Sequence, residues 1–274
     1  MSISGPDIDF ISQVVRQRSA IVLDRSKEYL IESRLQALAR ERGDASITEL
    51  VGKLRQSPNG PLRDAVVEAM TTNETSFFRD IHPFKALSET ILPELLVQRG
   101  RERSLNIWCA ACSSGQEPYT IAMLIQELIG ADPSWRVRLL GTDIDTKMLA
   151  RTKEGIYNQF EVNRGLPAHL LVRYFARHGM NYQIDTRLRN MVETKFLNLS
   201  EPFPPMPQMD VVFLRNVLIY FDVPMKKQIL AQVRKVLRPD GYLFLGGAET
   251  TMNVDDSWQR VSLGRATVYR PPAS

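Results

Sequence analysis

The strongest constraint on the fold is the alternation of two apolar patterns from residue 105 onward. Short apolar segments typical of buried strands are separated by longer segments in which apolar residues recur every three or four positions, as on a helix face. Strands that alternate with helices assemble into a parallel sheet with helices on both faces. The sequence therefore predicts a doubly wound α/β domain. Its expected strands cover 105–109, 137–141, 191–196, 210–214 and 242–245, and its expected helices cover 117–129, 145–153 and 223–236.

The flanking regions follow other patterns. Helical spacing from the start of the chain predicts an all-helical N-terminal domain over 1–80, and a helix at 81–99 would open the α/β domain of 81–274. The stretch Arg238-Pro239-Asp240-Gly241 is expected to stop the last helix. We expect an antiparallel hairpin at the sheet edge, formed by 258–261 and 266–269.

One segment does not fit the alternation. Between 155 and 190 the chain is longer than a connection needs to be, and it contains a helical pattern at 167–177 and a strand-like pattern at 181–184. We interpret this segment as a small inserted β-subdomain, spanning about 155–195, that pairs with the strand at 191–196. Insertions of this kind often recognise partners.

Composition limits the class of protein. At 274 residues and 43% hydrophobic content the chain can bury a full core. No apolar run approaches the roughly 20 residues that span a bilayer, and the first residues lack a basic segment followed by an apolar one, which predicts a cytoplasmic protein without membrane insertion. The formal charge of +4 permits an acidic partner, but Lys and Arg are spread along the chain, so nucleic-acid binding is not expected.

The two cysteines, Cys109 and Cys112, have a C-x-x-C spacing that would suit a redox or metal site. However, there is no second cysteine pair, and the three histidines show no ligand spacing. Because Cys109 ends an apolar strand and Cys112 lies in the following turn, we interpret both as small buried side chains and expect no metal.

In a doubly wound sheet, ligands bind beyond the carboxyl ends of the strands. The first strand is followed by small residues and then by Glu117-Pro118, where a helix begins. This loop matches neither the glycine-rich dinucleotide fingerprint nor the P-loop. Glu117 at the helix start would repel a diphosphate, whereas an amino group or a sulfonium would tolerate it.

The next strand ends favour a nucleoside. Asp143 and Asp145 follow the second strand, and either could hold ribose hydroxyls or only cap the next helix. We assign the ribose to Asp143 and the cap to Asp145. After the third strand, Asn198-Leu199 suits an adenine, and after the fourth, Arg215-Asn216 is hard to explain as core, with Tyr220 near the same edge.

The segment 71–80 matches neither secondary-structure period. It could cap a helix that runs from about Ile81, or it could line a ligand site with small polar side chains, two aromatic residues and one Arg. Because it precedes a predicted nucleoside site, we interpret it as a lid between the two domains, with Phe77 and Phe78 for packing and Asp80 as the helix cap.

A nucleoside site without a phosphate cradle, and with an acidic residue near the first loop, points to S-adenosylmethionine rather than NAD or ATP. The sequence also resembles the chemotaxis receptor methyltransferases, the CheR family, over nearly its whole length. The resemblance lies in three motifs: Asn73-Glu74-Thr75-Ser76-Phe77-Phe78-Arg79, the stretch from Trp108 to Tyr119, and Arg215-Asn216-Val217-Leu218-Ile219-Tyr220-Phe221. It implies that the following residues contact the cofactor: Asn73, Thr75, Arg79, Glu117, Asp143, Asn198, Leu199, Arg215 and Asn216. It also implies that Arg79 and Tyr220 face the transferred methyl group.

The resemblance implies O-methylation of glutamate side chains on the cytoplasmic helices of chemoreceptors, with S-adenosylhomocysteine as the other product. A glutamate with a pKa of about 4.3 is ionised at neutral pH and needs no general base, which agrees with the absence of a paired-carboxylate or Ser-His-Asp motif. Two other functions stay open: a non-catalytic sensor of S-adenosylmethionine, and a nicotinamide-dependent oxidoreductase. A sensor would not need Arg79, Arg215, Asn216 and Tyr220 together, and the missing glycine fingerprint disfavours the oxidoreductase.

The expected partner surface is the basic side of helix 26–42, which carries Lys27, Arg34, Arg40 and Arg42 among its apolar positions. Such a charge pattern can equally be a solvated helix face. A receptor C-terminal peptide could bind the β-subdomain, as it does in some members of the family. We expect the protein to be a monomer.

Overall fold

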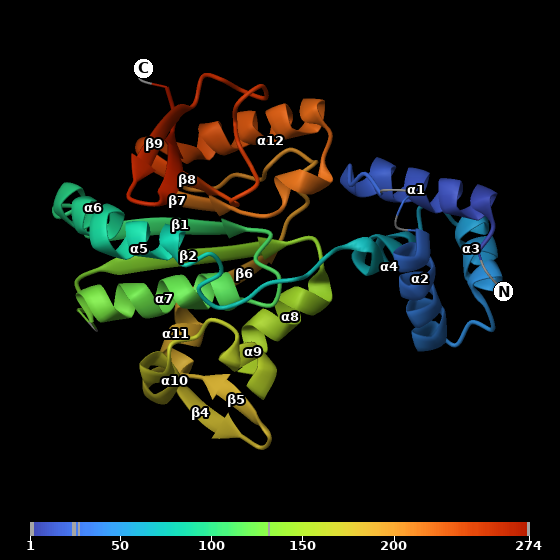
Figure 1. Ribbon diagram of the computed structural model, residues 1–274, viewed down its shortest axis with the longest axis horizontal. Helices are drawn as coiled ribbons and strands as arrows, with labels where there is room; N and C mark the ends of the chain where they lie inside the picture. Colours follow the sequence, from blue (N-terminus) through green and yellow to red (C-terminus); the bar gives the residue numbers. More distant parts are fainter. Residues whose placement is uncertain (1–2, 24–25, 27, 131, 273–274) are drawn as a thin grey trace.

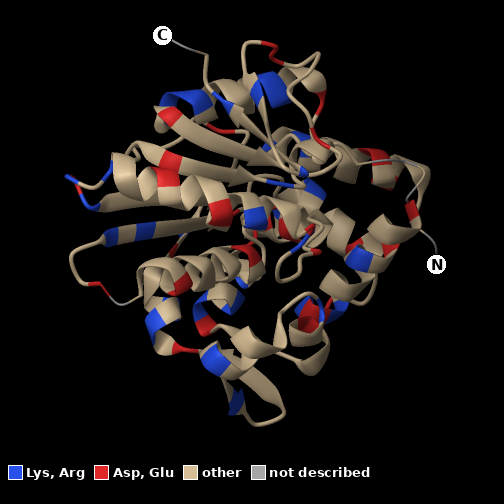
Figure 2. Ribbon diagram, turned by 60° about the vertical axis from the view of Figure 1, so that its left-hand side comes forward, with Lys and Arg blue, Asp and Glu red and all other residues tan. Residues whose placement is uncertain are grey.

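The computed structural model describes residues 3–23, 26, 28–130 and 132–272. Figure 1 shows a group of N-terminal helices beside a larger part built on a sheet, with a second, smaller sheet below it. No helix within these ranges is long and apolar enough to cross a membrane. Basic and acidic residues are interspersed along the ribbon, as the sequence indicates (Figure 2).

The N-terminal region is all-helical, as predicted, and has its own apolar core. Ser4 and Ser46 cap the first and third helices by accepting hydrogen bonds from the backbone N–H groups of Asp7 and Glu49, and Pro61 opens the fourth. The expected helix at 26–42 begins at Glu28 in the structure, and Lys27 lies outside the described residues. The four helices are α1 (Gly5–Ser19), α2 (Glu28–Arg42), α3 (Ile47–Gln56) and α4 (Pro61–Met70).

The large sheet has seven strands in the order β6-β2-β1-β7-β8-β10-β9. The five strands from β6 to β8 are parallel, and β10 joins antiparallel, so the predicted doubly wound sheet with an edge hairpin is confirmed. The chain leaves β1 toward β2 and later crosses to β7 on the other side, which places the switch point at the carboxyl ends of β1 and β7. The strands are β1 (Ser104–Ala110), β2 (Arg136–Asp143), β6 (Val192–Phe196), β7 (Met209–Leu214), β8 (Leu237–Leu245), β9 (Gln259–Leu263) and β10 (Ala266–Arg270).

Helices cover both faces of this sheet, and each face has its own apolar cluster. The helices α5, α6 and α7 lie on one side and α12 on the other (Figure 1). The predicted helix at 81–99 is present, with a π-helical turn, Leu87–Ile91, in its middle. The remaining helices are α5 (His82–Ala86), α6 (Leu92–Gln98), α7 (Gln116–Ile129), α8 (Thr146–Glu154), α11 (Thr186–Met191) and α12 (Val223–Val236).

The inserted segment forms a separate three-stranded sheet in the order β3-β5-β4. The predicted pairing with the strand at 191–196 is wrong, because α11 stands between β5 and β6 and β6 pairs with β2 instead. The predicted helix at 167–177 ends at Tyr174, and the residues after it form β4, which turns into β5 at Gly179. The elements are β3 (Ile156–Tyr157), α9 (Gln159–Asn163), α10 (Ala168–Tyr174), β4 (Phe175–His178) and β5 (Asn181–Ile184).

The start of β8 also differs from the expectation. The helix α12 ends at Val236, as predicted, but β8 begins directly after it at Leu237 and not at 242, so Arg238-Pro239-Asp240-Gly241 belong to the strand. A register shift between Met209 and Val211 accommodates them. Gly241 is required there, because a Cβ would lie 2.9 Å from the carbonyl oxygen of Asp210.

Candidate active site

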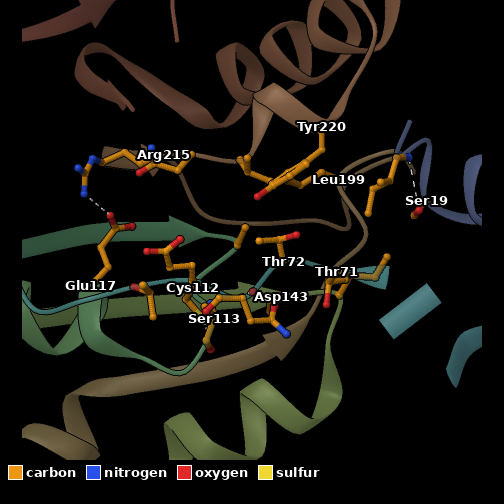
Figure 3. A pocket seen from close by; sticks show the side chains of 18 of the residues that line it. Ser19, Thr71, Thr72, Cys112, Ser113, Glu117, Asp143, Leu199, Arg215 and Tyr220 are labelled. Atoms are coloured by element: carbon orange, nitrogen blue, oxygen red, sulfur yellow. Dashed lines mark hydrogen bonds and ion pairs between the residues drawn. The ribbon is translucent and has the colours of Figure 1, made fainter. Parts of the chain in front are cut away.

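One cavity of about 960 Å³, including its open mouth, lies at the carboxyl ends of β1, β2, β6 and β7 (Figure 3). This is the switch point of the sheet, where ligands bind in doubly wound folds. The structure brings every sequence-predicted site residue to its wall: Asn73, Thr75, Arg79, Glu117, Asp143, Asn198, Leu199, Arg215, Asn216 and Tyr220. Residues from α1 and the following segment, Ser19 and Ile21, also line it and were not predicted.

The loop after β1 is shaped by backbone contacts. Ala111 and Ser113 have positive φ angles of 59° and 50°. Cys112 donates its N–H to the carbonyl of Thr142 at 2.8 Å, and Gly141 leaves room for its sulfur, since a Cβ at Gly141 would lie 3.1 Å from Cys112 Sγ. Both cysteines are buried and free, and burial raises the pKa of each thiol well above its usual value. The interpretation of the cysteines as small buried side chains is therefore confirmed.

Asp143 ends β2 at the floor of the cavity and is 6% exposed. Its carboxylate accepts the backbone N–H of Ser113 at 2.8 Å and that of Asp145 at 2.9 Å. Each carboxylate oxygen has two lone pairs and can accept a second hydrogen bond, so both oxygens can still accept a ligand hydroxyl. Asp145 caps α8, as predicted, and its other oxygen accepts from Asn73 Nδ2 at 2.7 Å.

Burial raises the pKa of Asp143 to about 6, and three backbone N–H groups oppose the shift. A ligand hydroxyl donates most strongly to the ionised carboxylate, so binding should favour ionised Asp143. We expect cofactor affinity to be constant above about pH 7 and to fall by up to about tenfold per pH unit below about pH 6. Calorimetric titration with the cofactor at several pH values across this range measures the affinity. The dependence should persist in Glu117→Gln and vanish in Asp143→Asn; a dependence that survives in Asp143→Asn contradicts this assignment.

A buried ion pair faces the other end of the cavity. Arg215 Nη1 donates to Glu117 at 2.8 Å, and the two side chains are 2% and 12% exposed (Figure 3). Arg215 Nη2 donates to the carbonyl of Arg79 at 2.9 Å and to Asp80 at 2.8 Å. Burial raises the pKa of Glu117, and the Arg215 guanidinium counteracts that shift. One guanidinium thus ties the start of α7 to the segment 71–80.

Asp80 does not cap a helix, contrary to the expectation. The residue before α5 is Ile81, which makes no side-chain capping bond, and the Asp80 carboxylate is held by Arg215 instead. The segment around it is strained, because Phe78, Asp80 and Ile81 have φ angles of 50°, 67° and 30°. Phe78 N–H donates to Thr120 at 3.2 Å.

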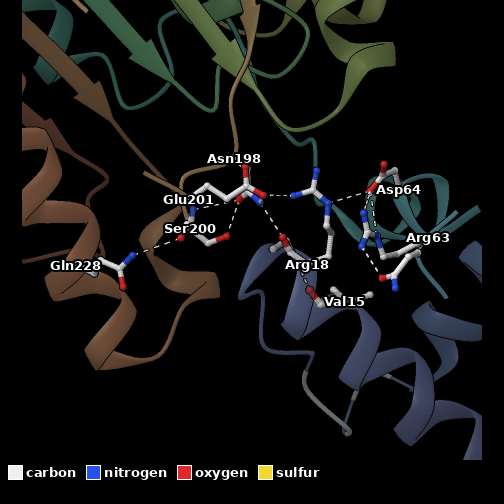
Figure 4. A network of polar contacts seen from close by, with 10 residues as sticks. Val15, Arg18, Arg63, Asp64, Asn198, Ser200, Glu201 and Gln228 are labelled. Atoms are coloured by element: carbon white, nitrogen blue, oxygen red, sulfur yellow. Dashed lines mark hydrogen bonds and ion pairs between the residues drawn. The ribbon is translucent and has the colours of Figure 1, made fainter. Parts of the chain in front are cut away.

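A polar network ties the third strand end to α1 (Figure 4). Asn198 Nδ2 donates to the carbonyl of Arg18 at 2.7 Å, and its Oδ1 accepts from Ser200 N–H at 3.1 Å. Arg18 also pairs with Asp64 at 2.9 Å and with Glu201. The side-chain amide of Asn198 is therefore already engaged, and its neighbour Leu199 adds an apolar residue to the cavity lining.

The loop after β7 depends on a residue that was not predicted. Glu249 accepts the backbone N–H groups of Asn216 and Gly246, both at 2.7 Å, and that of Ile219 at 3.3 Å. It holds Asn216 in the left-handed region at φ 57°. Glu249 follows the end of β8, so applying the strand-end rule to this strand as well would have found it.

Tyr220 lies in a 3-10 turn, Leu218–Tyr220, with its carbonyl accepting Val22 N–H at 2.9 Å. On α2, Arg40 and Arg42 are exposed. Arg34 is not free: it donates to the carbonyl of Met70 at 2.8 Å and to Thr72 at 3.1 Å. The expected basic surface is therefore smaller than the sequence indicates, because one of its cations holds the lining of the cavity.

The site combines the hydrogen-bond-accepting carboxylate of Asp143, the apolar side chain of Leu199 and the buried carboxylate of Glu117, and the described loop after β1 lacks the glycine-rich pattern of a phosphate-binding loop. Among the described residues no group of three or more His, Cys, Asp or Glu could hold a metal ion. A doubly wound sheet with this cavity at its switch point is the arrangement expected of an S-adenosylmethionine-dependent methyltransferase.

Comparison with known proteins gives the family. The family model "CheR methyltransferase, SAM binding domain" matches residues 73–267, and "CheR methyltransferase, all-alpha domain" matches residues 6–71. The chain belongs to the CheR methyltransferase family.

Its relatives match over nearly their whole length. Chemotaxis protein methyltransferase 1 of Pseudomonas aeruginosa is 40% identical over 274 residues, which cover 98% of this chain and 99% of that protein. Chemotaxis protein methyltransferase Cher2 of Pseudomonas putida is 37% identical with the same coverage. Chemotaxis protein methyltransferase of Vibrio parahaemolyticus is 36% identical and covers 98% of each chain. The chain is thus a methyltransferase of chemotaxis, and the sequence-based assignment to this family is confirmed.

Proposed function

We propose that the protein is a protein-glutamate O-methyltransferase that esterifies glutamate side chains on the cytoplasmic domains of chemoreceptors. The observation that carries the proposal is the cavity itself, in which the ribose acceptor Asp143 and the buried Glu117–Arg215 pair share one space with Arg79 and Tyr220. The relatives' names support a substrate in chemotaxis.

The residues present fit S-adenosylmethionine. Asp143 would accept both ribose hydroxyls, and the backbone at Asn198 with Leu199 would take the adenine. Glu117 would attract the cationic end, while Asn73 and Thr75 from the lid segment, with Arg215 and Asn216, would complete the enclosure. When bound, the cofactor supplies a methyl group on a positively charged sulfur.

For methyl transfer, the chain mainly has to orient the substrate carboxylate relative to the methyl group of the cofactor. The substrate glutamate is ionised at neutral pH, so the chain needs no general base. The carboxylate and the sulfonium lose opposite charges together, so aligned reactants in a water-poor cavity favour transfer. Arg79 would position the carboxylate or the cofactor beside the methyl group, and the Tyr220 hydroxyl would hydrogen-bond nearby.

Tyr220→Phe tests the second of these roles. The change removes only the hydroxyl, so we expect methyl transfer to slow by about tenfold or more while cofactor affinity stays within about threefold. Single-turnover transfer and calorimetry measure the two quantities. Wild-type turnover in this variant would exclude a chemical role for the hydroxyl.

We further propose a division of labour along the chain. The helical domain of residues 1–80 would dock on receptor helices through Arg40 and Arg42, which are exposed on α2. The domain of residues 81–274 would carry out transfer, and its inserted subdomain, which ends before β6 of the large sheet and not at about 195, would bind a receptor C-terminal peptide. The protein would act as a cytoplasmic monomer.

Transfer of a tritium-labelled methyl group to a purified receptor cytoplasmic fragment tests the function. We expect label on the receptor fragment and stoichiometric S-adenosylhomocysteine. Binding of the cofactor without transfer to any receptor fragment would contradict the proposal and support a sensor.

A further inference from the structure

The lid segment is fixed to the inserted subdomain by one aromatic ring. Phe77 is fully buried, and its ring packs edge-on against Tyr157 of β3 and Phe175 of β4, with centroid distances of 5.0 and 5.7 Å. Tyr157 and Phe175 also contact each other edge-on at 6.3 Å. Such edge-to-face pairs are directional as well as apolar. Since both partners belong to the small sheet, the ring orientation of Phe77 depends on the inserted subdomain.

The backbone of Phe77 is held as closely as its ring. Gly165, between α9 and α10, has a φ of 88°, and a Cβ there would lie 2.1 Å from the carbonyl oxygen of Phe77. The atom that it would meet belongs to the backbone and cannot rotate away. Arg164 adds an ion pair with Glu74, but both side chains are more than half exposed, so this link is weak.

The segment needs such support because its conformation is unfavourable. Phe78, Asp80 and Ile81 all have positive φ angles, and Arg79 lies among them. Non-glycine residues keep this conformation only where the surroundings restrain them. The same subdomain reaches the cofactor side, because Tyr157 donates its hydroxyl to the carbonyl of Ser114 at 2.8 Å.

We propose that the inserted subdomain positions the lid segment, residues 71–80. The contact between Phe77 and Gly165 would orient Arg79 toward the reacting methyl group. This role is separate from any peptide that the subdomain binds, and it rests on the proposed function. Gly165 and Phe77 are positioning residues, since neither lines the cavity.

Gly165→Ala tests the contact directly. Gly179 at the β4–β5 turn is a matched control: it has a φ of 59°, and a Cβ there would meet nothing within 4 Å. Both variants place an Ala at a positive φ, but only at Gly165 would its Cβ collide with the backbone of Phe77. We expect Gly165→Ala to lower kcat on the receptor fragment by about tenfold or more while the dissociation constant for S-adenosylmethionine stays within about threefold, because small misplacements near the reacting atoms are costly. Gly179→Ala should stay within about twofold in both.

The outcomes separate the two proposals. If the wild-type protein does not methylate receptor fragments, the proposed function fails. If it does, and folded Gly165→Ala turns over normally or loses no more than Gly179→Ala, the positioning role is wrong. If Gly165→Ala lacks a cooperative thermal transition, Phe175→Leu decides, because it keeps an apolar side chain and removes the edge contact with Phe77. We then expect a severalfold loss in kcat at unchanged cofactor affinity, and wild-type kcat overturns the proposal.

Discussion

Replacing Asp143 by Ala should abolish most of the cofactor affinity. The carboxylate is buried at the end of β2 and would accept both ribose hydroxyls. A hydrogen bond to a charged group contributes about 1.5–3 kcal/mol, so losing two should weaken binding at least about 100-fold. Isothermal titration with S-adenosylmethionine and with S-adenosylhomocysteine measures the loss, which should be similar for both because they share the ribose.

Asp185→Ala is the matched control. Asp185 also accepts a backbone N–H, from Arg187 at 2.7 Å, but it caps α11 outside the cavity. We expect its cofactor affinity to stay within about twofold, with a small loss of stability from the missing cap. Unchanged affinity in a folded Asp143→Ala protein would remove Asp143 from the ribose site.

Arg215→Lys should be the second large effect. Arg215 donates to Glu117, to Asp80 and to the carbonyl of Arg79 at the same time, and the single ammonium of the shorter, flexible Lys side chain cannot reproduce that planar fork. Lys keeps the positive charge but cannot bond to all three acceptors, and a buried acceptor left without its hydrogen bond costs about 1–3 kcal/mol, more for a charged group such as Glu117. We expect methyl transfer to fall at least about 100-fold and the thermal midpoint to drop.

Arg138→Lys provides the comparison for this change. Arg138 pairs with Glu193 at 2.8 Å, but the two side chains are 38% and 39% exposed. An exposed pair contributes little, so turnover and thermal midpoint should stay close to wild type. If Arg215→Lys behaved like Arg138→Lys, the buried pair would not organise the site.

The fold was predictable wherever a local pattern decides it. The strands near 105, 137 and 210 are apolar runs that end in polar residues, and the structure gathers those polar residues around one cavity. Asp145 was correctly assigned as a cap because a capping residue acts on its own next turn. Such features need only neighbouring residues.

The predictions that were wrong concern features that depend on contacts between residues far apart in the sequence. Asp80 has the chemistry of a cap, but Arg215, far along the chain, takes its carboxylate. Phe175 continues a helical pattern, yet it enters a strand because it pairs with Ile184 and packs on Phe77. Whether β5 pairs with β6 or with its own small sheet is decided by α11, and no periodicity in the inserted segment indicates that choice.

The chemical nature of the bond that links the transferred methyl group to the receptor tests the central claim most directly. Receptor fragment labelled by the protein and tritiated S-adenosylmethionine should release its label as methanol under mild base, because a glutamate methyl ester hydrolyses readily. Complete, volatile release is the result that we predict. Label that stays on the fragment after base treatment would mean N-methylation and would contradict glutamate as the acceptor.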